Sequence, residues 1–180
     1  MVWSYDPIHS SVFCTARHLR IAFVRGVFRK VEAKLDLEAP DPTGWSADVT
    51  IDAASIDTGV EMRDEDLRGP NHLNVAEFPT MSFVSKRVEP RGGSDYSLVG
   101  DLTIRGVTKE VALAMRYNGE ITDPRNTTRR GFDCEVKLRR TDFGMKVALP
   151  LPPPWNEGTV ADELDVSIEV EAIQGEIRPW

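Results

Sequence analysis

Residues 55–70 have the sequence Ser-Ile-Asp-Thr-Gly-Val-Glu-Met-Arg-Asp-Glu-Asp-Leu-Arg-Gly-Pro, and the interpretation of the whole chain depends on them. Thr58 and Glu61 have the spacing of a capping box, in which each side chain satisfies a free backbone N–H at the start of a helix. Residues 62–67 then follow as two helical turns. Gly69 can adopt the left-handed conformation that ends many helices, and Pro70 prevents continuation. The stretch therefore predicts one short, charged helix.

On both sides of residues 55–79, apolar and polar residues alternate as they do in half-buried strands. The clearest example is the pair of segments 96–104 and 107–117. A two-residue turn at Arg105-Gly106 pairs Ile104 with Val107, and it brings the apolar positions of both segments to the same side of a sheet. We also expect a short edge strand at residues 3–6, an irregular segment or one helical turn at 19–24, and one strand over 27–37.

The pattern predicts an all-β fold with roughly eight strands, and the short helix lies between its two groups of strands. Eight antiparallel strands with one apolar face each bury that face by closing into a barrel, which can hold one small ligand. A two-sheet sandwich is the alternative. The length of 180 residues and the absence of a repeat or linker predict a single domain over residues 1–180.

The composition narrows the range of partners. A net charge of −7 disfavours nucleic acids and anionic membrane surfaces, which require a basic protein surface. No apolar run approaches the length that spans a bilayer, so we expect no stable membrane insertion. We predict a cytoplasmic protein, because no export signal precedes the first expected strand. Cys14 and Cys134 are the only cysteines, and in a reducing compartment both are expected to be free and buried.

Beyond this pattern, the chain resembles the YceI-like family of lipid-binding proteins, which have an extended lipocalin-like barrel. The resemblance covers nearly the whole chain and rests on the order and spacing of many short motifs. These motifs are Trp3, Asp6-Pro7, His9-Ser10, Arg17-His18-Leu19, residues 24–28, Ile51-Asp52, residues 55–59, Arg63-Asp64, Leu67-Arg68, residues 78–80, residues 83–85, residues 100–109 and residues 140–144.

The resemblance implies a barrel around an elongated apolar tunnel, which holds a polyisoprenoid or isoprenoid-quinone chain without covalent chemistry. It implies no catalytic residue and no cofactor other than such a bound lipid. The function is then to sequester or transport an isoprenoid-type lipid. The residues that we expect to bind the ligand are Cys14, Met81, Phe83, Leu102, Leu113, Met115, Phe132, Val136, Phe143 and Trp155.

The chain also departs from the family pattern. Cys14 stands where the family tends to have an aromatic residue, and His72-Leu73 replaces two aromatics after the helix. The segment 149–155 is longer and richer in proline than expected. If these residues line the tunnel, they change its width, so the fold carries over better than the identity of the ligand.

Alternative functions remain open from the sequence. The apolar faces could pack into a filled core, as in a stress-related structural protein. An isomerase or cyclase acting on an apolar substrate would need a titratable group in the lumen, and His18 is the strand histidine on an inward face. The histidines fit no metal-ligand spacing, so no metal site is predicted, and His9 is expected to make a structural hydrogen bond.

Two structural expectations concern the charged and aromatic residues on the surface. Arg63 is expected to pair with Asp57 or Asp101 and so to lock the helix over the barrel. Phe13 and Phe28 are expected to be exposed, and together they suggest the face of a homodimer.

Overall fold

The computed structural model describes residues 3–146, 149–154 and 158–176. Strands make up most of this chain, with one α-helix and three short 3-10 helices. In chain order the elements are β1 (Trp3–Tyr5), β2 (Ser11–His18), β3 (Ala22–Phe28), β4 (Val31–Asp36), η1 (Pro42–Gly44), β5 (Ser46–Asp52), η2 (Ala53–Ser55), β6 (Ile56–Asp57), α1 (Glu61–Arg68), β7 (Thr80–Gly92), β8 (Asp95–Ile104), β9 (Val107–Thr122), β10 (Thr128–Arg139), η3 (Arg140–Phe143) and β11 (Val160–Gln174).

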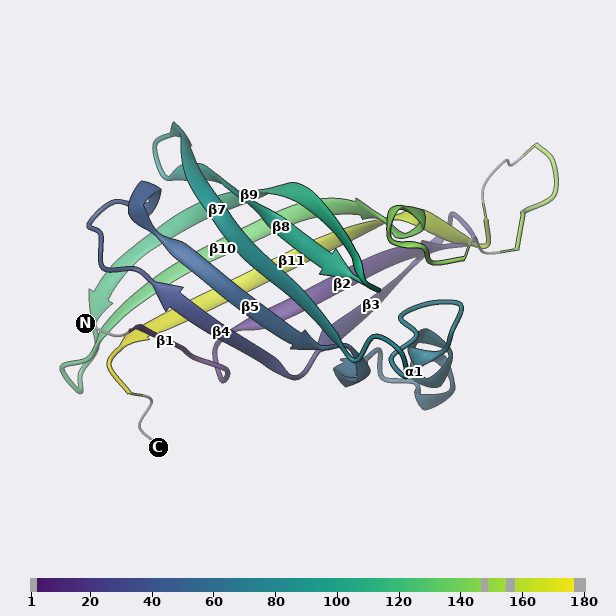
Figure 1. Cartoon of the computed structure of the whole chain (residues 1–180), viewed down its shortest axis with the longest axis horizontal. Coiled ribbons are helices and arrows are strands. Elements are labelled where there is room, and N and C mark those ends of the chain that lie inside the picture. The colour runs from purple at the N-terminus through teal and green to yellow at the C-terminus, as the bar shows by residue number, and fades with distance from the viewer. Residues whose placement is uncertain (1–2, 147–148, 155–157, 177–180) are drawn as a thin grey trace.

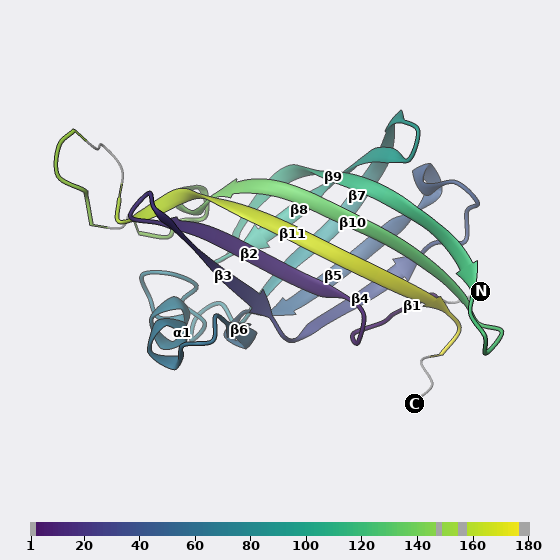
Figure 2. The same cartoon turned by 180° about the vertical axis from the view of Figure 1, so that it is seen from behind.

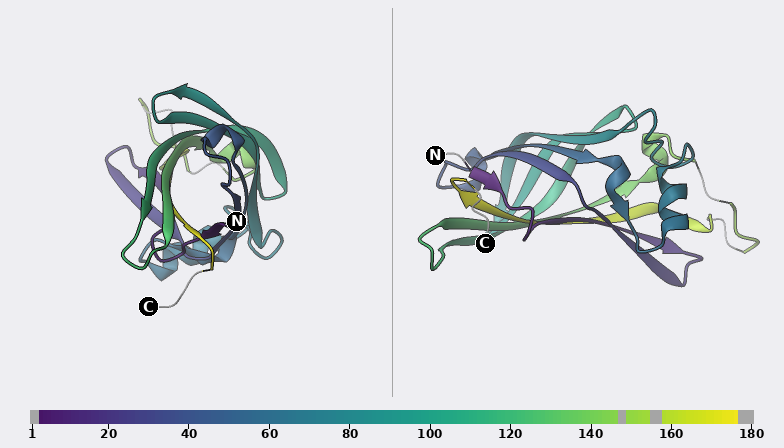
Figure 3. Two further views of the ribbon diagram at one scale, coloured as in Figure 1. Left: turned by 90° about the vertical axis from the view of Figure 1, so that its left-hand side faces the viewer. Right: turned by 90° about the horizontal axis from the view of Figure 1, so that it is seen from below.

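The strands close into an eight-stranded antiparallel barrel, as predicted (Figure 1). The hydrogen-bonded order is β1-β4-β5-β7-β8-β9-β10-β11, and β11 pairs back with β1 to complete the circle. Trp3 of β1 lies opposite Leu35 on one side and Gln174 on the other. The end-on view in Figure 3 shows the strands surrounding a common axis. The prediction of an edge strand at residues 3–6 is therefore wrong, because β1 has a partner on both sides.

The two ends of the barrel are built differently. At one end β11 pairs with β1, whereas toward the other end it pairs with β2 (Figure 2). There β3 pairs with β2 and with the two-residue strand β6, where Val27 lies opposite Asp57. The helix α1 lies at this end beside β3 and β6 (Figure 3, right). A helix and a loop, rather than a further strand, therefore cover this side of the barrel.

The hairpin between β8 and β9 has the predicted register. Ile104 lies opposite Val107 and Leu98 opposite Leu113. Arg105 and Gly106 have φ angles of 50° and 71°, as a type I′ turn requires. The local sequence sufficed here because a two-residue turn fixes the register of both strands.

The helix is present as predicted, but neither of its ends has the predicted cap. Val60 is the N-cap and makes no side-chain cap hydrogen bond, while Thr58 interacts with Asp64 instead. Gly69 has a φ of −70°, so it is not left-handed. No helix in the described part of the chain is long and apolar enough to cross a membrane.

Two segments near the N-terminus also differ from expectation. Residues 19–24 are not irregular throughout: Leu19 and Arg20 form a turn with positive φ, and β3 begins at Ala22. The expected strand 27–37 is broken at Arg29 and Lys30, whose backbone N–H groups donate to Ser55. This break separates β3 from β4.

Aromatic residues fill the end of the barrel that lies away from α1. Trp45 contacts the ring of Tyr117 edge-on, with 5.0 Å between the centroids, and the ring of Phe132 at 5.9 Å. The buried guanidinium of Arg130 lies 4.7 Å from the Trp3 ring and 5.1 Å from the Trp45 ring. Arg130 also donates to the carbonyl oxygens of Leu37 and Ala39 and pairs with Glu120. We call this the closed end.

Candidate functional site

An apolar cavity lies inside the barrel, because alternate residues of its strands point inward. Its inner compartment has a volume of about 140 Å³. The lining consists almost entirely of hydrocarbon and aromatic side chains, which come from every strand except β6. They include Val31, Ala33, Val49, Phe83, Leu98, Leu102, Leu113, Phe132, Val136, Ile168 and Val170.

A wider compartment of about 380 Å³ opens at the end beside α1, and we call it the mouth. The mouth and the inner compartment adjoin, because five residues line both of them. These shared residues are Phe28, Met81, Ile104, Leu138 and Val166. The volume of the mouth falls within the range of about 300–1,000 Å³ that is typical of small-molecule sites.

Seven of the ten predicted ligand-binding residues line this cavity. Cys14 lines the mouth and Met81 lines both compartments. The inner compartment is lined by Phe83, Leu102, Leu113, Phe132 and Val136. Met115 and Phe143 are buried in the core but line neither compartment, and Trp155 lies outside the described residues. Ligand binding by all ten stays a prediction.

Phe28 corrects an expectation. The sequence places it on the surface as part of a dimer face, but its side chain lines both compartments of the cavity. The break at Arg29 and Lys30 is the reason, because it turns both Phe28 and Val31 inward although they are three residues apart. Alternation within one continuous strand could not find this arrangement. Phe13 is half-buried beneath Arg25, whose guanidinium lies 4.0 Å from the ring centroid.

Arg140 brings a positive charge to the wall of the mouth. It is only 6% exposed and begins the short helix η3. Its Nε donates to the carbonyl oxygen of Ala161 at 3.0 Å and its Nη2 to that of Val160 at 3.2 Å. Within the described residues it has no salt bridge and no further acceptor, so it has donors left over among its five N–H groups. Burial lowers the pKa of Arg140, and the charge of Asp162 opposes this shift.

His72 lies in the same wall. Its Nε2 is 3.3 Å from a carboxylate oxygen of the exposed Asp66, while Arg105 donates to its backbone carbonyl. Burial lowers the pKa of His72, and the nearby charges of Arg140 and Arg105 lower it further against the opposing effect of Asp66. His72 is therefore neutral at pH 7, and Arg140 is the buried cation of this wall.

Arg63 does not make the predicted ion pair with Asp57 or Asp101. Its Nε donates to Thr58 Oγ1 at 2.7 Å and its Nη2 to the Thr58 carbonyl at 2.9 Å. Asp57 pairs with Arg29 instead, and Asp101 pairs with Lys86. The buried carboxylate of Asp64 accepts from Thr58 N–H and Oγ1. Thr58 thus joins α1 to the end of β6 at the rim of the mouth.

The two cysteines are free, as predicted, but only Cys134 is fully buried, and Cys14 is half-buried. Burial raises the pKa of Cys14 to about 11 and that of Cys134 to about 12. Both thiols are therefore protonated near neutral pH, and a protonated thiol is a poor nucleophile. Cys14 and Cys134 contribute small apolar surface to the cavity wall.

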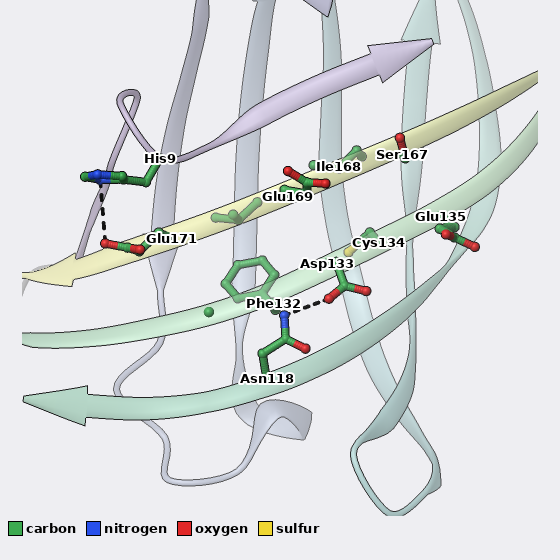
Figure 4. A pocket seen from close by; sticks show the side chains of 12 residues that line it. His9, Asn118, Phe132, Asp133, Cys134, Glu135, Ser167, Ile168, Glu169 and Glu171 are labelled. Carbon is green, nitrogen blue, oxygen red and sulfur yellow. Dashed lines mark hydrogen bonds and ion pairs between the residues drawn. The ribbon is translucent and has the colours of Figure 1, made fainter. Parts of the chain in front are cut away.

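A second hollow of about 420 Å³ lies on the outer face of β9, β10 and β11 (Figure 4). Acidic side chains dominate it, among them Asp133, Glu135, Glu169 and Glu171. A hollow of this polarity is a poor site for an apolar ligand.

His9, at the edge of the outer hollow, makes the structural hydrogen bond predicted for it, with 2.8 Å between its Nδ1 and Asp6 Oδ2. Asp6, His9 and Glu171 lie close enough to hold a metal ion, a grouping that the sequence spacing did not predict. Arg129 already donates to Asp6 and Glu171, so its guanidinium occupies the position of a cation beside them.

Comparisons with known proteins, by sequence and by structure, give relatives that agree with one another. The YceI-like domain matches residues 3–172. Protein YceI of Escherichia coli is 33% identical over 166 residues, which cover 92% of this chain and 82% of the relative. The crystal structure of BcnA from Burkholderia cenocepacia superposes with a TM-score of 0.80 at 24% identity, over 93% of this chain and 99% of BcnA.

A further solved structure is described as a polyisoprenoid binding domain from Saccharophagus degradans. It superposes with a TM-score of 0.72 at 12% identity and covers 97% of this chain and 99% of its own. At this identity the likeness concerns the fold alone.

Proposed function

The chain belongs to the YceI-like family, and from this premise we propose that it binds an isoprenoid-type lipid, a polyprenol or an isoprenoid quinone, in its barrel. The observation that carries the proposal is the pair of adjoining compartments, the mouth and the apolar interior, inside the barrel. The polyisoprenoid binding domain from Saccharophagus degradans, which has the same fold, supports this class of ligand. Binding is non-covalent, and the protein acts as a carrier or store of the lipid rather than as an enzyme.

The two compartments of the cavity differ in polarity, and this difference predicts the orientation of the ligand. The inner compartment is lined by apolar side chains and ends at the aromatic residues of the closed end, so it suits the hydrocarbon tail. The mouth carries the unused donors of Arg140, so it suits the oxygen of an alcohol or a quinone. The head group therefore lies beside Arg140 and the tail extends inward.

The energetics favour such a complex. Each methylene transferred from water into an apolar lumen contributes about 0.8 kcal/mol. Ordering the ligand costs several kcal/mol, so a tail of a few isoprene units binds tightly even after this cost.

The alternatives fit the geometry less well. A filled core predicts no internal cavity, and the two compartments count against it. The enzyme hypothesis named His18 as the titratable group of the lumen, but His18 is exposed at the rim of the mouth. Cytoplasmic location, homodimer formation and transport to a partner stay predictions.

The decisive measurement is native mass spectrometry of the purified protein, followed by analysis of its organic-solvent extract and by uptake of an added polyprenol. We expect a one-to-one complex. Ala33→Phe projects a large side chain into the inner compartment and should reduce uptake at least tenfold. Lys34→Phe, on the opposite face of the same strand, is the matched control and should bind as the original protein does.

Two results would contradict the proposal. One is a protein that takes up no polyprenol at any concentration. The other is equal uptake by Ala33→Phe and Lys34→Phe, which would place the lipid outside the lumen.

A further inference from the structure

Large apolar side chains are exposed on three segments at the end of the barrel that carries the mouth. They belong to the β2–β3 hairpin, to α1 with its N-cap, and to the segment after η3 (Figures 1 and 2). Ile21 is 85% exposed and Phe23 62% exposed. The full set is Leu19, Ile21, Phe23, Val60, Met62 and Leu149.

Two of these segments are joined by backbone hydrogen bonds. Leu19 N–H donates to the carbonyl of Thr159 at 2.8 Å, and Thr159 N–H donates to the carbonyl of Leu149 at 2.7 Å. Leu149 thus lies next to the turn that Leu19 and Arg20 make between β2 and β3. We call residues 17–25 together with Leu149 the hairpin tip.

The charge of the hairpin is opposite to that of the whole protein. Residues 17–25 contain three arginines and no acidic residue, whereas the chain carries a net charge of −7. Arg17 lies over the Phe23 ring at 4.9 Å. Within the described residues, neither Arg17 nor Arg25 forms a salt bridge with a carboxylate.

The acidic residues on the neighbouring strand do not neutralise these arginines. Asp162 pairs with Arg139 on β10, and both Glu163 and Asp165 pair with Lys137. The hairpin therefore combines the charges of Arg17 and Arg25, which are in no salt bridge within the described residues, with exposed apolar side chains, as protein segments that lie at the boundary between head groups and acyl chains do.

We propose that the hairpin tip docks on the surface of an anionic lipid bilayer and thereby turns the mouth of the cavity toward the membrane. The arginines attract anionic head groups, while Ile21 and Phe23 enter the boundary beneath them. The hairpin also supplies Val24 and His18 to the lining of the mouth, so docking there brings the opening of the cavity to the lipid surface. The net negative charge predicts repulsion from such a membrane, but attraction at short range depends on the local charge.

The test is co-sedimentation of the full chain with vesicles of phosphatidylcholine alone or with a third of phosphatidylglycerol. We expect binding to the anionic vesicles and weaker binding to the neutral ones. Arg17→Gln with Arg25→Gln should weaken binding to anionic vesicles about twenty-five-fold, since each arginine near such a surface contributes roughly a factor of five. Ile21→Gln with Phe23→Gln should weaken binding to both kinds of vesicle.

Ile121→Gln is the matched control for the apolar pair. Ile121 is 67% exposed near the β9–β10 hairpin at the opposite end of the barrel, and its replacement should leave vesicle binding unchanged. The proposal is overturned if the original protein does not sediment with anionic vesicles, or if the Ile21 and Phe23 double variant binds as well as the original. Sedimentation velocity provides a second overturning result: a dimer that this double variant dissociates, without vesicle binding, would make the hairpin tip an interface between copies.

Uptake of a polyprenol added from ethanol, without vesicles, separates this proposal from the proposed function. None of the residues changed in the hairpin lines the cavity, so the variants should take up the polyprenol normally. Normal uptake without vesicle binding would refute membrane docking alone. Absence of uptake by the original protein would refute the lipid-binding function itself.

Discussion

Arg140 gives the mouth its polarity in a single buried side chain. The carbonyl oxygens of Val160 and Ala161 are neutral partners, so they hold the guanidinium in place without cancelling its charge. A hydrogen bond from a charged donor is stronger than one from a neutral donor, and the low exposure of the site strengthens it further. If the mouth binds a lipid head group as proposed, Arg140 would distinguish a lipid with an oxygen-bearing head from a plain hydrocarbon.

Replacement of Arg140 by Met should weaken the binding of a polyprenol about tenfold or more, because a hydrogen bond to a charged group contributes about 1.5–3 kcal/mol. Binding of squalene, which has no oxygen, should change little. Arg139→Met is the matched control, since Arg139 is exposed and pairs with Asp162 on the outer face. Fluorescence titration of both ligands would measure the effect, and an equal loss for both ligands would exclude a role in head-group recognition.

His72 makes the stability of the protein depend on pH. The pKa of His72 in the folded protein lies below the ordinary value of 6.5, mainly because of burial. Below about pH 6.5 the unfolded chain therefore takes up a proton more readily than the folded protein does. The contribution of His72 to stability is complete above this pH and declines as the pH falls toward the lowered value.

Urea unfolding at about pH 7.5 and about pH 5.5 should accordingly show a larger loss of stability for the original protein than for His72→Gln. His18→Gln changes an exposed histidine at the rim and should leave the difference between the two pH values in place. A His72→Gln protein with the original pH dependence would show that other groups cause it.

At the scale of the element, close contact between strands β7 and β8 depends on Gly100. A Cβ atom at this position would lie 2.5 Å from the backbone oxygen of Val84 and 2.6 Å from Cζ of Phe83. Backbone cannot move aside cheaply, so the two strands would have to separate. Gly131 on β10 offers a contrast, because a Cβ there meets only Asn118 at 3.7 Å.

Gly100→Ala should therefore destabilise the protein by about 1–3 kcal/mol, the usual cost of overpacking. Gly131→Ala should be neutral or slightly stabilising, since it restricts the unfolded chain without a clash. Chemical denaturation of the two variants beside the original protein would test this difference. Similar stabilities for both would show that β7 and β8 can relax around a methyl group.

Local patterns were sufficient for some elements and insufficient for others. The β8–β9 hairpin was predictable because its turn sequence fixes the register. The break between β3 and β4 was not, because it depends on hydrogen bonds to Ser55, twenty-five residues or more away along the chain. The ends of α1 were wrong for a similar reason, since Asp64 competes for the Thr58 hydroxyl on which the expected capping box relies.

At the scale of the whole molecule, the fold was more predictable than the site. The apolar faces of the strands require a closed barrel, and the predicted inward residues such as Leu102 and Leu113 line its cavity. The polar wall of the mouth was missed, because Arg140 entered the prediction only as part of the motif 140–144, and only the folded chain brings it into the same wall as His72. Predicting such a wall requires knowing which loops the barrel brings together.

The aromatic residues of the closed end shut one end of the lumen, so that the lumen opens at the mouth. If the lumen binds a lipid as proposed, the lipid would enter and leave by the mouth, with its tail going in first and coming out last. The distance from Arg140 to the Trp45 side chain then sets the length of the lipid tail that fits between the mouth and the closed end. A tail that is too short leaves the residues at the closed end without a contact. A tail that is too long holds its head group beyond the reach of the Arg140 guanidinium. Such a protein would select its cargo by length, without recognising any individual isoprene unit.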